Sequence, residues 1–242
     1  MRVLVISDIH ANLTALETVI NDAGIVDSVW CLGDLVGYGP DPNECVEKIR
    51  QLPNLSCIIG NHDAAALKII AADTFNPEAR TALVWTQNVL SQSNKVFLGS
   101  LTDRIVWHDV TLTHGSPRQP VWEYILDVRT ATQNFEFFTT PLCFIGHTHL
   151  PVIYSYSDSV PYARLSIPEP NQRILLPIRS IVNPGSVGQP RDRNPRASYA
   201  IFDSEERTVT FDRVPYDVRT TRRKILKAGL PPILGERLLL GL

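Results

Sequence analysis

The sequence predicts an α/β fold, with one domain over residues 1–242 built from two β-sheets and helices on the outside. Three observations support this prediction. The first third of the chain alternates short β-branched runs with helical patterns, which is typical of a mostly parallel sheet. From residue 142 onwards short strand patterns dominate. The chain contains no clear linker or internal repeat, so both sheets are expected within one domain.

The first part of the chain is expected to contain strands and helices in alternation. Three buried strands are expected, over residues 2–7, 28–34 and 55–63. Apolar residues recur at helical spacing over 13–23 and the pattern stops at Gly24, which predicts the first helix. A second helix is expected at about 42–52. Residues 63–95 are expected to be helical with one break at Asn76-Pro77.

The second part is expected to consist mainly of short strands. Two strands joined by a tight turn are predicted within 103–117, and a helix within 124–138. Further strand candidates lie at 142–146, 151–157, 162–166, 173–176, 180–183, 197–203 and 207–213. A basic helix at about 216–228 precedes a leucine-rich tail. This tail is expected to pack either on the body of the protein or on a second subunit of a homo-oligomer.

Composition narrows the class of protein. The net charge is −2, from 23 basic and 25 acidic residues, so neither a nucleic-acid nor a membrane partner is expected. No apolar stretch approaches the roughly 20 residues that span a bilayer. The four cysteines, Cys31, Cys45, Cys57 and Cys143, lie among apolar residues and form no CxxC pair. They indicate reduced core residues of a cytoplasmic protein.

Polar side chains gather where five of the predicted strands end. The five endings read DIH (8–10), GD (33–34), GNHD (60–63), THG (113–115) and GHTH (146–149). Five of the six histidines lie in them, and only His108 lies elsewhere, in a predicted turn. Because ligands bind at the carboxyl ends of strands in open α/β sheets, the five endings are expected to converge in space.

The residue types in these endings indicate metal chemistry. They offer carboxylate, amide and imidazole ligands but no thiolate, a set that suits Mn²⁺, Fe or Zn²⁺. Seven candidate ligands are too many for one four-coordinate zinc, and they fit two ions that share a carboxylate. Two such ions can activate water and neutralise phosphoryl oxygens, which favours phosphoester hydrolysis.

These five blocks, in this order, resemble the calcineurin-like metallophosphoesterase family, whose pattern is D-x-H, G-D, G-N-H-[DE], a lone H and G-H-x-H. The short layout and the segment NPGSVGQPR (183–191) look most like its small prokaryotic, phosphodiesterase-like branch. The resemblance implies a four-layer α/β/β/α sandwich, with two mixed β-sheets flanked by helices. It also implies one metal ion on Asp8, His10 and His149, a second on Asn61, His114 and His147, and Asp34 as the bridge between them.

The same resemblance implies an activity. A metal-activated hydroxide would attack phosphorus, with His62 as general acid. Asp63 would orient His62, or would cap the following helix instead. Phosphodiesters are the expected substrates, and phosphomonoesters, phosphoproteins and dinucleoside polyphosphates remain open. Manganese is the expected metal, with iron, zinc or nickel as alternatives. A non-enzymatic scaffold of the same fold is disfavoured because the ligand set is complete.

Four further residues are candidates for contacts with a small phosphoester substrate. Asn12 could contact the phosphate or cap the first helix, and capping is favoured. Tyr38 could stack on the substrate or belong to a rigid turn. Arg118 could face the anionic substrate or take part in loop packing. Arg191 is the candidate in the 183–196 loop for reaching a phosphate.

Overall fold

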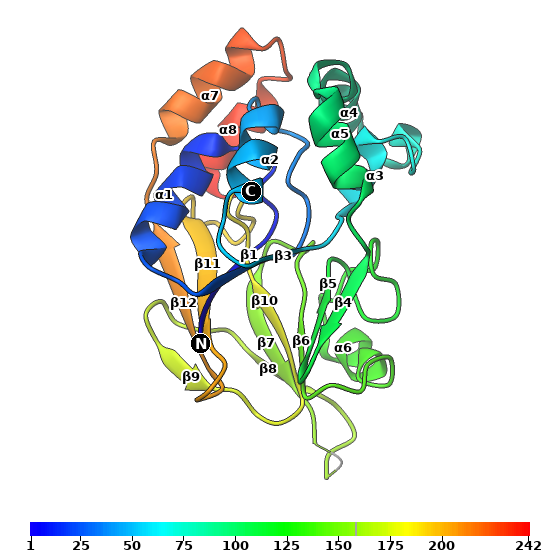
Figure 1. Ribbon diagram of the computed structural model, residues 1–242, viewed down its shortest axis with the longest axis vertical. Helices are drawn as coiled ribbons and strands as arrows, with labels where there is room; N and C mark the ends of the chain where they lie inside the picture. The colour runs from blue at the N-terminus through cyan, green and yellow to red at the C-terminus, as the bar shows by residue number, and fades with distance from the viewer. Residues whose placement is uncertain (158) are drawn as a thin grey trace.

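A computed structural model describes residues 1–157 and 159–242. Over these residues, twelve strands form two six-stranded sheets. The first sheet contains, in spatial order, β3 (Leu55–Cys57), β2 (Ser28–Cys31), β1 (Arg2–Ile6), β11 (Ala197–Asp203), β12 (Thr208–Val214) and β9 (Arg173–Leu175). The second contains β4 (Arg104–Trp107), β5 (Val110–Thr113), β6 (Leu142–Phe144), β10 (Ser180–Pro184), β7 (Pro151–Ser155) and β8 (Arg164–Ser166). Figure 1 shows α6 beside the second sheet and the other helices mainly above the two sheets.

Both sheets are mixed, with the parallel part in the strands that lead to the polar endings. In the first sheet β1, β2 and β3 run parallel, as the alternating pattern predicts, whereas β11, β12 and β9 pair antiparallel. In the second sheet β5, β6 and β10 run parallel. Parallel neighbours present their carboxyl ends at one edge, so the polar endings are brought together there.

The helices follow the predicted order, except that the region predicted as helical over 63–95 contains several shorter helices. They are α1 (Leu13–Ala23), α2 (Pro42–Arg50), α3 (Asn61–Ala66), the 3-10 turn η1 (Ala72–Thr74), α4 (Pro77–Val89), α5 (Gln92–Gly99), α6 (Val128–Asn134), α7 (Val218–Lys227) and α8 (Ile233–Leu240).

The region predicted as helical over 63–95 is divided into shorter pieces. The third strand ends at Cys57 rather than continuing to residue 63, because α3 already begins at Asn61. The predicted break at Asn76-Pro77 is a helix start, where the Asn76 side chain accepts a hydrogen bond from the Ala79 amide at 2.9 Å. Asparagine at the N-cap followed by proline favours initiation of a helix, so the break separates two helices.

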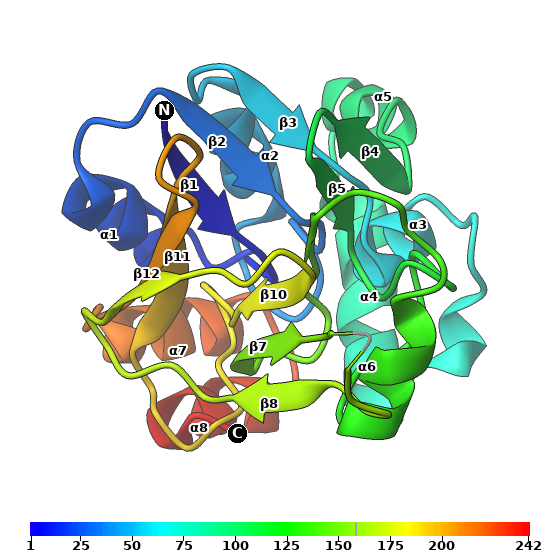
Figure 2. The ribbon, with the colours of Figure 1, turned by 90° about the horizontal axis from the view of Figure 1, so that it is seen from below.

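Three apolar layers give the four-layer arrangement. On the outer face of the first sheet, Leu16 and Val19 of α1 join a cluster with Leu4 and Ile6 of β1. Between the sheets, the ring centroid of Phe144 lies 5.4 Å from that of Trp30 and 5.2 Å from that of Phe202. A third cluster joins α6 to the outer face of the second sheet. The predicted α/β fold with two mixed sheets between helices is confirmed (Figure 2).

The leucine-rich tail packs on the body of the protein. Leu230, Leu234 and Leu238 lie in one buried cluster with Tyr38 of the 36–39 loop and Ala82 of α4. This is the first of the two alternatives expected for the tail, and it brings α8 close to the polar edge of the sheets. None of the helices in the described ranges is both long enough and apolar enough to cross a membrane.

The aromatic contacts between the sheets should dominate the stability of the fold. We expect Phe144→Ala to lower the free energy of unfolding by about 3–5 kcal/mol, because the ring is fully buried and its removal leaves a cavity. Denaturant unfolding measures the change. Ile25→Ala is the matched control, since Ile25 is 92% exposed and its truncation should change stability by less than about 0.5 kcal/mol. Equal effects of the two substitutions would contradict this account of the core.

Candidate metal centre

Seven polar side chains meet at the edge where the parallel strands end. They come from the loops after β1, β2, β5 and β6 and from the first residue of α3. They are Asp8, His10, Asp34, Asn61, His114, His147 and His149, and each is at most 2% exposed. The predicted convergence in space is therefore present, although Asp8 and His149 lie 141 positions apart in the sequence.

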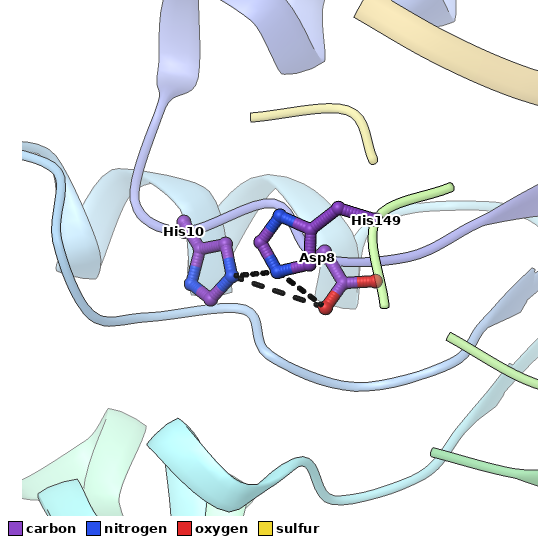
Figure 3. Close-up of side chains that lie close together, drawn as sticks. All are labelled: Asp8, His10 and His149. Atoms are coloured by element: carbon purple, nitrogen blue, oxygen red, sulfur yellow. Dashed lines mark hydrogen bonds and ion pairs between the residues drawn. The ribbon is translucent and has the colours of Figure 1, made fainter. Parts of the chain in front are cut away.

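Three of these side chains form a first group, shown in Figure 3, in which they point toward one another. His10 Nε2 lies 3.1 Å from His149 Nε2. Asp8 Oδ1 lies 3.3 Å from His149 Nε2 and 3.8 Å from His10 Nε2. Three ligand atoms so close together could contact a single ion.

A second group lies beside the first and shares Asp34 with it. His114 Nε2 lies 3.1 Å from Asn61 Oδ1, and ligand atoms of Asp34, His114 and His147 lie within 4.8 Å of one another. Asp34 Oδ2 is 3.4 Å from His114 Nε2 and 3.7 Å from His10 Nε2. Asp34 therefore stands between the groups, in the position of a shared ligand.

Hydrogen bonds to backbone carbonyls orient the four histidines. Three of them donate through Nδ1: His10 to Val36 O (3.2 Å), His114 to Leu32 O (2.7 Å) and His149 to Gln189 O (2.5 Å). Each therefore directs the lone pair of Nε2 into the centre. His147 is reversed, since its Nε2 donates to Trp122 O at 3.2 Å and leaves Nδ1 as the ligand atom. Such outer hydrogen bonds are usual for histidines that bind metals.

Lone pairs face lone pairs in the first group. With Nδ1 of His10 and of His149 already donating, two acceptor nitrogens stand 3.1 Å apart. Asp8 Oδ1 and Asp34 Oδ2 are buried and have no hydrogen-bond partner among the described residues. Buried acceptors without donors are destabilising, and cations placed among them remove the repulsion. The donor set of imidazole nitrogen and carboxylate oxygen fits divalent transition metals.

The second oxygen of each carboxylate connects two of the sequence blocks. Asp8 Oδ2 accepts the amide of His147 at 3.0 Å, which joins the end of β1 to the GHTH loop. Asp34 Oδ1 accepts the amide of His62 at 2.9 Å, which joins the end of β2 to α3. In both Asp8 and Asp34, one carboxylate oxygen therefore accepts a backbone amide while the other faces the candidate metal ligands.

The backbone at the centre is strained. Five of the seven candidate ligands have left-handed φ angles, namely Asp8 (54°), His10 (48°), Asp34 (55°), His147 (65°) and His149 (62°). Each such residue costs about 1–2 kcal/mol relative to a right-handed conformation. Left-handed residues on both sides of Thr148 place His147 in one group and His149 in the other, although only one residue separates them.

The NPGS segment supports the GHTH loop from behind. Asn183 Nδ2 donates to Gly146 O at 2.6 Å and to Thr148 Oγ1 at 3.0 Å. Asn183 was not among the residues predicted from the sequence, although the segment that contains it was recognised as part of the pattern. Its role in positioning the loop follows only from the packing of β10 beside β6.

His62 lies at the rim of the two groups. Its ring centroid is 4.5 Å from that of Tyr38 and 4.8 Å from those of His10 and Phe75. Its Nδ1 is so close to Gly37 that a Cβ at that position would be 2.4 Å away. Burial lowers the pKa of His62 to about 4, against the opposing charge of Asp34.

Asp63 has a structural position rather than a catalytic one. Its Oδ1 accepts the amide of Val36 at 3.1 Å and its Oδ2 accepts the amide of Gly60 at 3.0 Å. Both oxygens are thereby occupied by backbone donors at the start of α3. This corrects the expectation that Asp63 orients His62 and favours the capping alternative.

Charge is distributed unevenly over the buried acids and histidines. Burial by itself would raise the pKa of Asp34, but the charges of His114 and His62 bring it well below its usual range. Burial opposes protonation of His114, yet the neighbouring Asp34 carboxylate raises the pKa of His114 to about 9. Burial raises the pKa of Asp8, so ionisation of this second carboxyl is unfavourable without a cation.

Two of the four residues predicted to contact the substrate, Asn12 and Arg118, bind other parts of the protein instead. Asn12 caps α1, with Oδ1 accepting the Ala15 amide at 3.3 Å, and its Nδ2 donates to Gly188 O at 2.9 Å. This is the favoured alternative for Asn12. For Arg118 the structure favours the loop-packing alternative, because Arg118 forms an ion pair with Glu123. Glu123 also accepts from Ser116, so the pair stabilises the loop after β5.

Aromatic side chains cover the centre. Tyr38 contacts both His62 and His10. Tyr124 stacks on His147 with ring centroids 3.8 Å apart, and Phe75 lies 5.2 Å from Trp122. Phe75 and Tyr124 had no specific signal in the sequence, because both come from irregular loops whose paths depend on tertiary packing.

The comparisons with known proteins agree with this geometry. The family profile of the calcineurin-like phosphoesterase superfamily domain matches residues 1–207. The crystal structure of a metallophosphoesterase from Sphaerobacter thermophilus is 47% identical and superposes with a TM-score of 0.92. The match covers 100% of this chain and 99% of that one.

Two further relatives are informative. The uncharacterized protein MJ0912 of Methanocaldococcus jannaschii is 40% identical over 247 aligned positions, 99% of this chain and 98% of that protein. The symmetrical bis(5'-nucleosyl)-tetraphosphatase of Baumannia cicadellinicola is 30% identical over 113 positions. This second match covers only 39% of each chain.

Because the carboxylates are buried, we expect metal binding to change the melting temperature of the protein. We expect Asp8→Asn to raise the melting temperature of the metal-free protein by a few degrees, because it removes a charge whose ionisation burial opposes. The same substitution should abolish most of the increase in melting temperature that added Mn²⁺ produces in the wild type. Differential scanning calorimetry with and without chelator measures both effects.

A matched control distinguishes this effect from a general effect of removing charge. Asp73→Asn changes an exposed aspartate in η1 and should leave both melting temperatures within about 1 °C of wild type. An Asp8→Asn protein that keeps the full metal-dependent increase would show that Asp8 is not a ligand.

Proposed function

The chain belongs to the calcineurin-like phosphoesterase superfamily, and on that premise we propose that it is a dinuclear metal-dependent hydrolase of phosphodiester bonds. One observation carries the proposal most directly. Two groups of buried acceptors converge on two neighbouring points and share one carboxylate, Asp34. A single structural ion would not require this second, connected set of ligands.

In this proposal Asp8, His10 and His149 hold one ion, and Asn61, His114 and His147 hold the other, with Asp34 between them. Two divalent ions there would activate water and neutralise the charge of the phosphoryl oxygens. Manganese is the proposed metal, because the ligands are nitrogen and oxygen without a thiolate; iron, zinc and nickel are the alternatives.

His62 is the proposed general acid. The Nδ1 of its ring is buried without a hydrogen-bond partner among the described residues, although the ring adjoins His10 and Tyr38. A substrate phosphate beside it would favour the protonated imidazole and so raise its pKa from the low value caused by burial. The ring would then donate its proton to the leaving oxygen.

The cover over the centre supports a small-molecule substrate. Rings of Tyr38, Phe75, Trp122 and Tyr124 surround the histidines, and the ligand side chains are almost fully buried. A phosphorylated protein segment would need a more open approach than a small ester. Phosphodiesters are therefore preferred over phosphoproteins. Dinucleoside polyphosphates are a second candidate, favoured by the partial match to a tetraphosphatase. We also propose a cytoplasmic location, because the four buried cysteines are free thiols.

The proposal predicts metal-dependent cleavage of a simple diester. Protein loaded with Mn²⁺ should hydrolyse bis(p-nitrophenyl) phosphate, chelation should abolish turnover, and Mn²⁺ should restore more activity than Zn²⁺ or Ni²⁺. Absorbance of released nitrophenolate measures the rate. Loaded protein that cleaves neither this diester nor p-nitrophenyl phosphate would refute the proposed function.

His62→Ala tests the general acid. We expect kcat to fall by about 10²–10⁴-fold, because proton donation to the leaving oxygen is lost, while metal content stays the same. Thymidine 5'-phosphate methyl ester should show a larger loss than a nitrophenyl ester, since methoxide is the more basic leaving group. His108→Ala is the control, because His108 lies in the turn between β4 and β5 and should not affect turnover. Unchanged turnover in His62→Ala would remove His62 from the mechanism.

A further inference from the structure

The proposed general acid, His62, is enclosed by its neighbours and is only 4% exposed. The ring centroids of His10 and Phe75 lie 4.8 Å from its own, and that of Tyr38 lies 4.5 Å away. Gly37 lies against Nδ1, since a Cβ at that position would be 2.4 Å from it. An ester whose leaving oxygen is to receive a proton from His62 must reach this ring, so one of the enclosing groups has to move.

Three of the four enclosing groups are held by contacts with the body of the protein. His10 is a candidate metal ligand, and its Nδ1 donates to the Val36 carbonyl at 3.2 Å. Tyr38 is 6% exposed and lies in the buried cluster with the C-terminal leucines. Gly37 lies between Tyr38 and Val36, whose amide donates to Asp63 at 3.1 Å. None of these groups can withdraw without disturbing the candidate ligands or the core.

Phe75, the fourth enclosing group, belongs to a segment with few such contacts. No residue between Ala66 and Ala79 is buried, and Ile69 is 67% exposed. Among the described residues, every hydrogen bond made by residues 68–76 has its partner close in sequence, within 64–80. Phe75 is the only residue of 68–76 that packs against a buried apolar cluster. Segments with so few buried contacts open at a low cost in free energy.

The two ends of this segment are fixed, which suits a hinged movement. At one end α3 is buried, and Gln87 of α4 donates to its Ala65 carbonyl at 2.8 Å. At the other end Asn76 caps the first turn of α4. Lys68 follows directly after α3 and has a left-handed φ of 63°. Positions at the end of a helix can absorb the dihedral changes of a hinge, so movement between Lys68 and Asn76 would leave both helices in place.

The loop after β5, which carries Trp122, is braced much more firmly. The ring centroid of Trp122 lies 5.2 Å from that of Phe75. Its neighbour Glu123 accepts a hydrogen bond from Asn134 of α6 at 2.8 Å, and the Trp122 carbonyl accepts one from His147 at 3.2 Å. Movement of this loop would displace a candidate ligand, whereas movement of the segment that carries Phe75 breaks mainly contacts of one aromatic ring.

We propose that residues 68–76 form a lid over the metal centre, that Phe75 closes this lid on His62, and that the lid opens to admit the ester and to release the products. The inference rests on the proposed function for the nature of the substrate, but access to His62 can be measured without turnover. The closed lid keeps bulk water away from the histidine ring. Opening separates the Phe75 ring from His62 and Trp122 and leaves the candidate ligands in position.

Chemical modification measures access to His62. Protein loaded with Mn²⁺ is treated with diethyl pyrocarbonate, and mass spectrometry of its peptides gives the rate of modification of His62 relative to that of the exposed His108. We expect Phe75→Ala to raise this ratio by about tenfold, because the ring that closes the approach is removed. Phe75→Tyr keeps the ring and should stay within about twofold of the wild type.

Two matched substitutions control for general effects on the structure. Phe97→Ala removes another half-buried phenylalanine ring, from α5, and Ile69→Ala removes an exposed side chain from the lid itself. Both should leave the ratio at the wild-type value, because neither side chain contacts His62. A ratio that Phe75→Ala does not change would overturn the inference.

Hydrogen–deuterium exchange tests whether the lid moves. In the wild type loaded with Mn²⁺, amides of residues 68–76 should exchange about tenfold faster than those of 115–124, although both segments contain several hydrogen-bonded amides. Equally slow exchange in the two segments would overturn the lid as a moving element. Neither measurement uses turnover, so a protein that shows both effects but cleaves no ester would retain the lid and refute only the proposed function.

Discussion

The site depends on two buried carboxylates, each of which uses one oxygen to bind the backbone and directs the other toward the candidate metal ligands. Asp8 and Asp34 each accept one backbone amide, from His147 and His62, and each directs its other oxygen toward the histidines. The first contact joins the two sheets at their carboxyl ends, and the second joins the first sheet to α3. Substituting either residue therefore affects both the ligand set and the position of a neighbouring block.

These interactions make the centre a region of stored unfavourable energy. Left-handed residues, buried charges and facing lone pairs are concentrated within a few ångströms, and the rigid sheets on either side hold them in place. The packed layer of Trp30, Phe144 and Phe202 between the sheets supplies the stability that offsets this strain. The ligand geometry therefore lowers stability at the centre, and packing elsewhere in the domain offsets this loss.

Elements far along the chain complete the site. Asn183, the first residue of the NPGS segment, supports the GHTH loop, and the carbonyl of Gln189, after that segment, accepts a hydrogen bond from His149. The C-terminal helices α7 and α8 pack on Tyr38 and bring Arg237 to its outer side. The ligands and the covering aromatic rings lie before residue 150, whereas part of the structure that supports them comes from residues after 180.

The sequence by itself determined the strand endings and hence the seven candidate ligands, because residue type and position after a buried strand are local properties. It also determined the alternation of strands and helices and the two-sheet class. Only the tertiary structure decided which neighbours each side chain meets. Asp63 faces backbone amides, Arg118 pairs with Glu123, and Phe75 and Tyr124 cover the histidines. These contacts join irregular loops remote in sequence, and their paths depend on the packing of the whole domain rather than on local pattern.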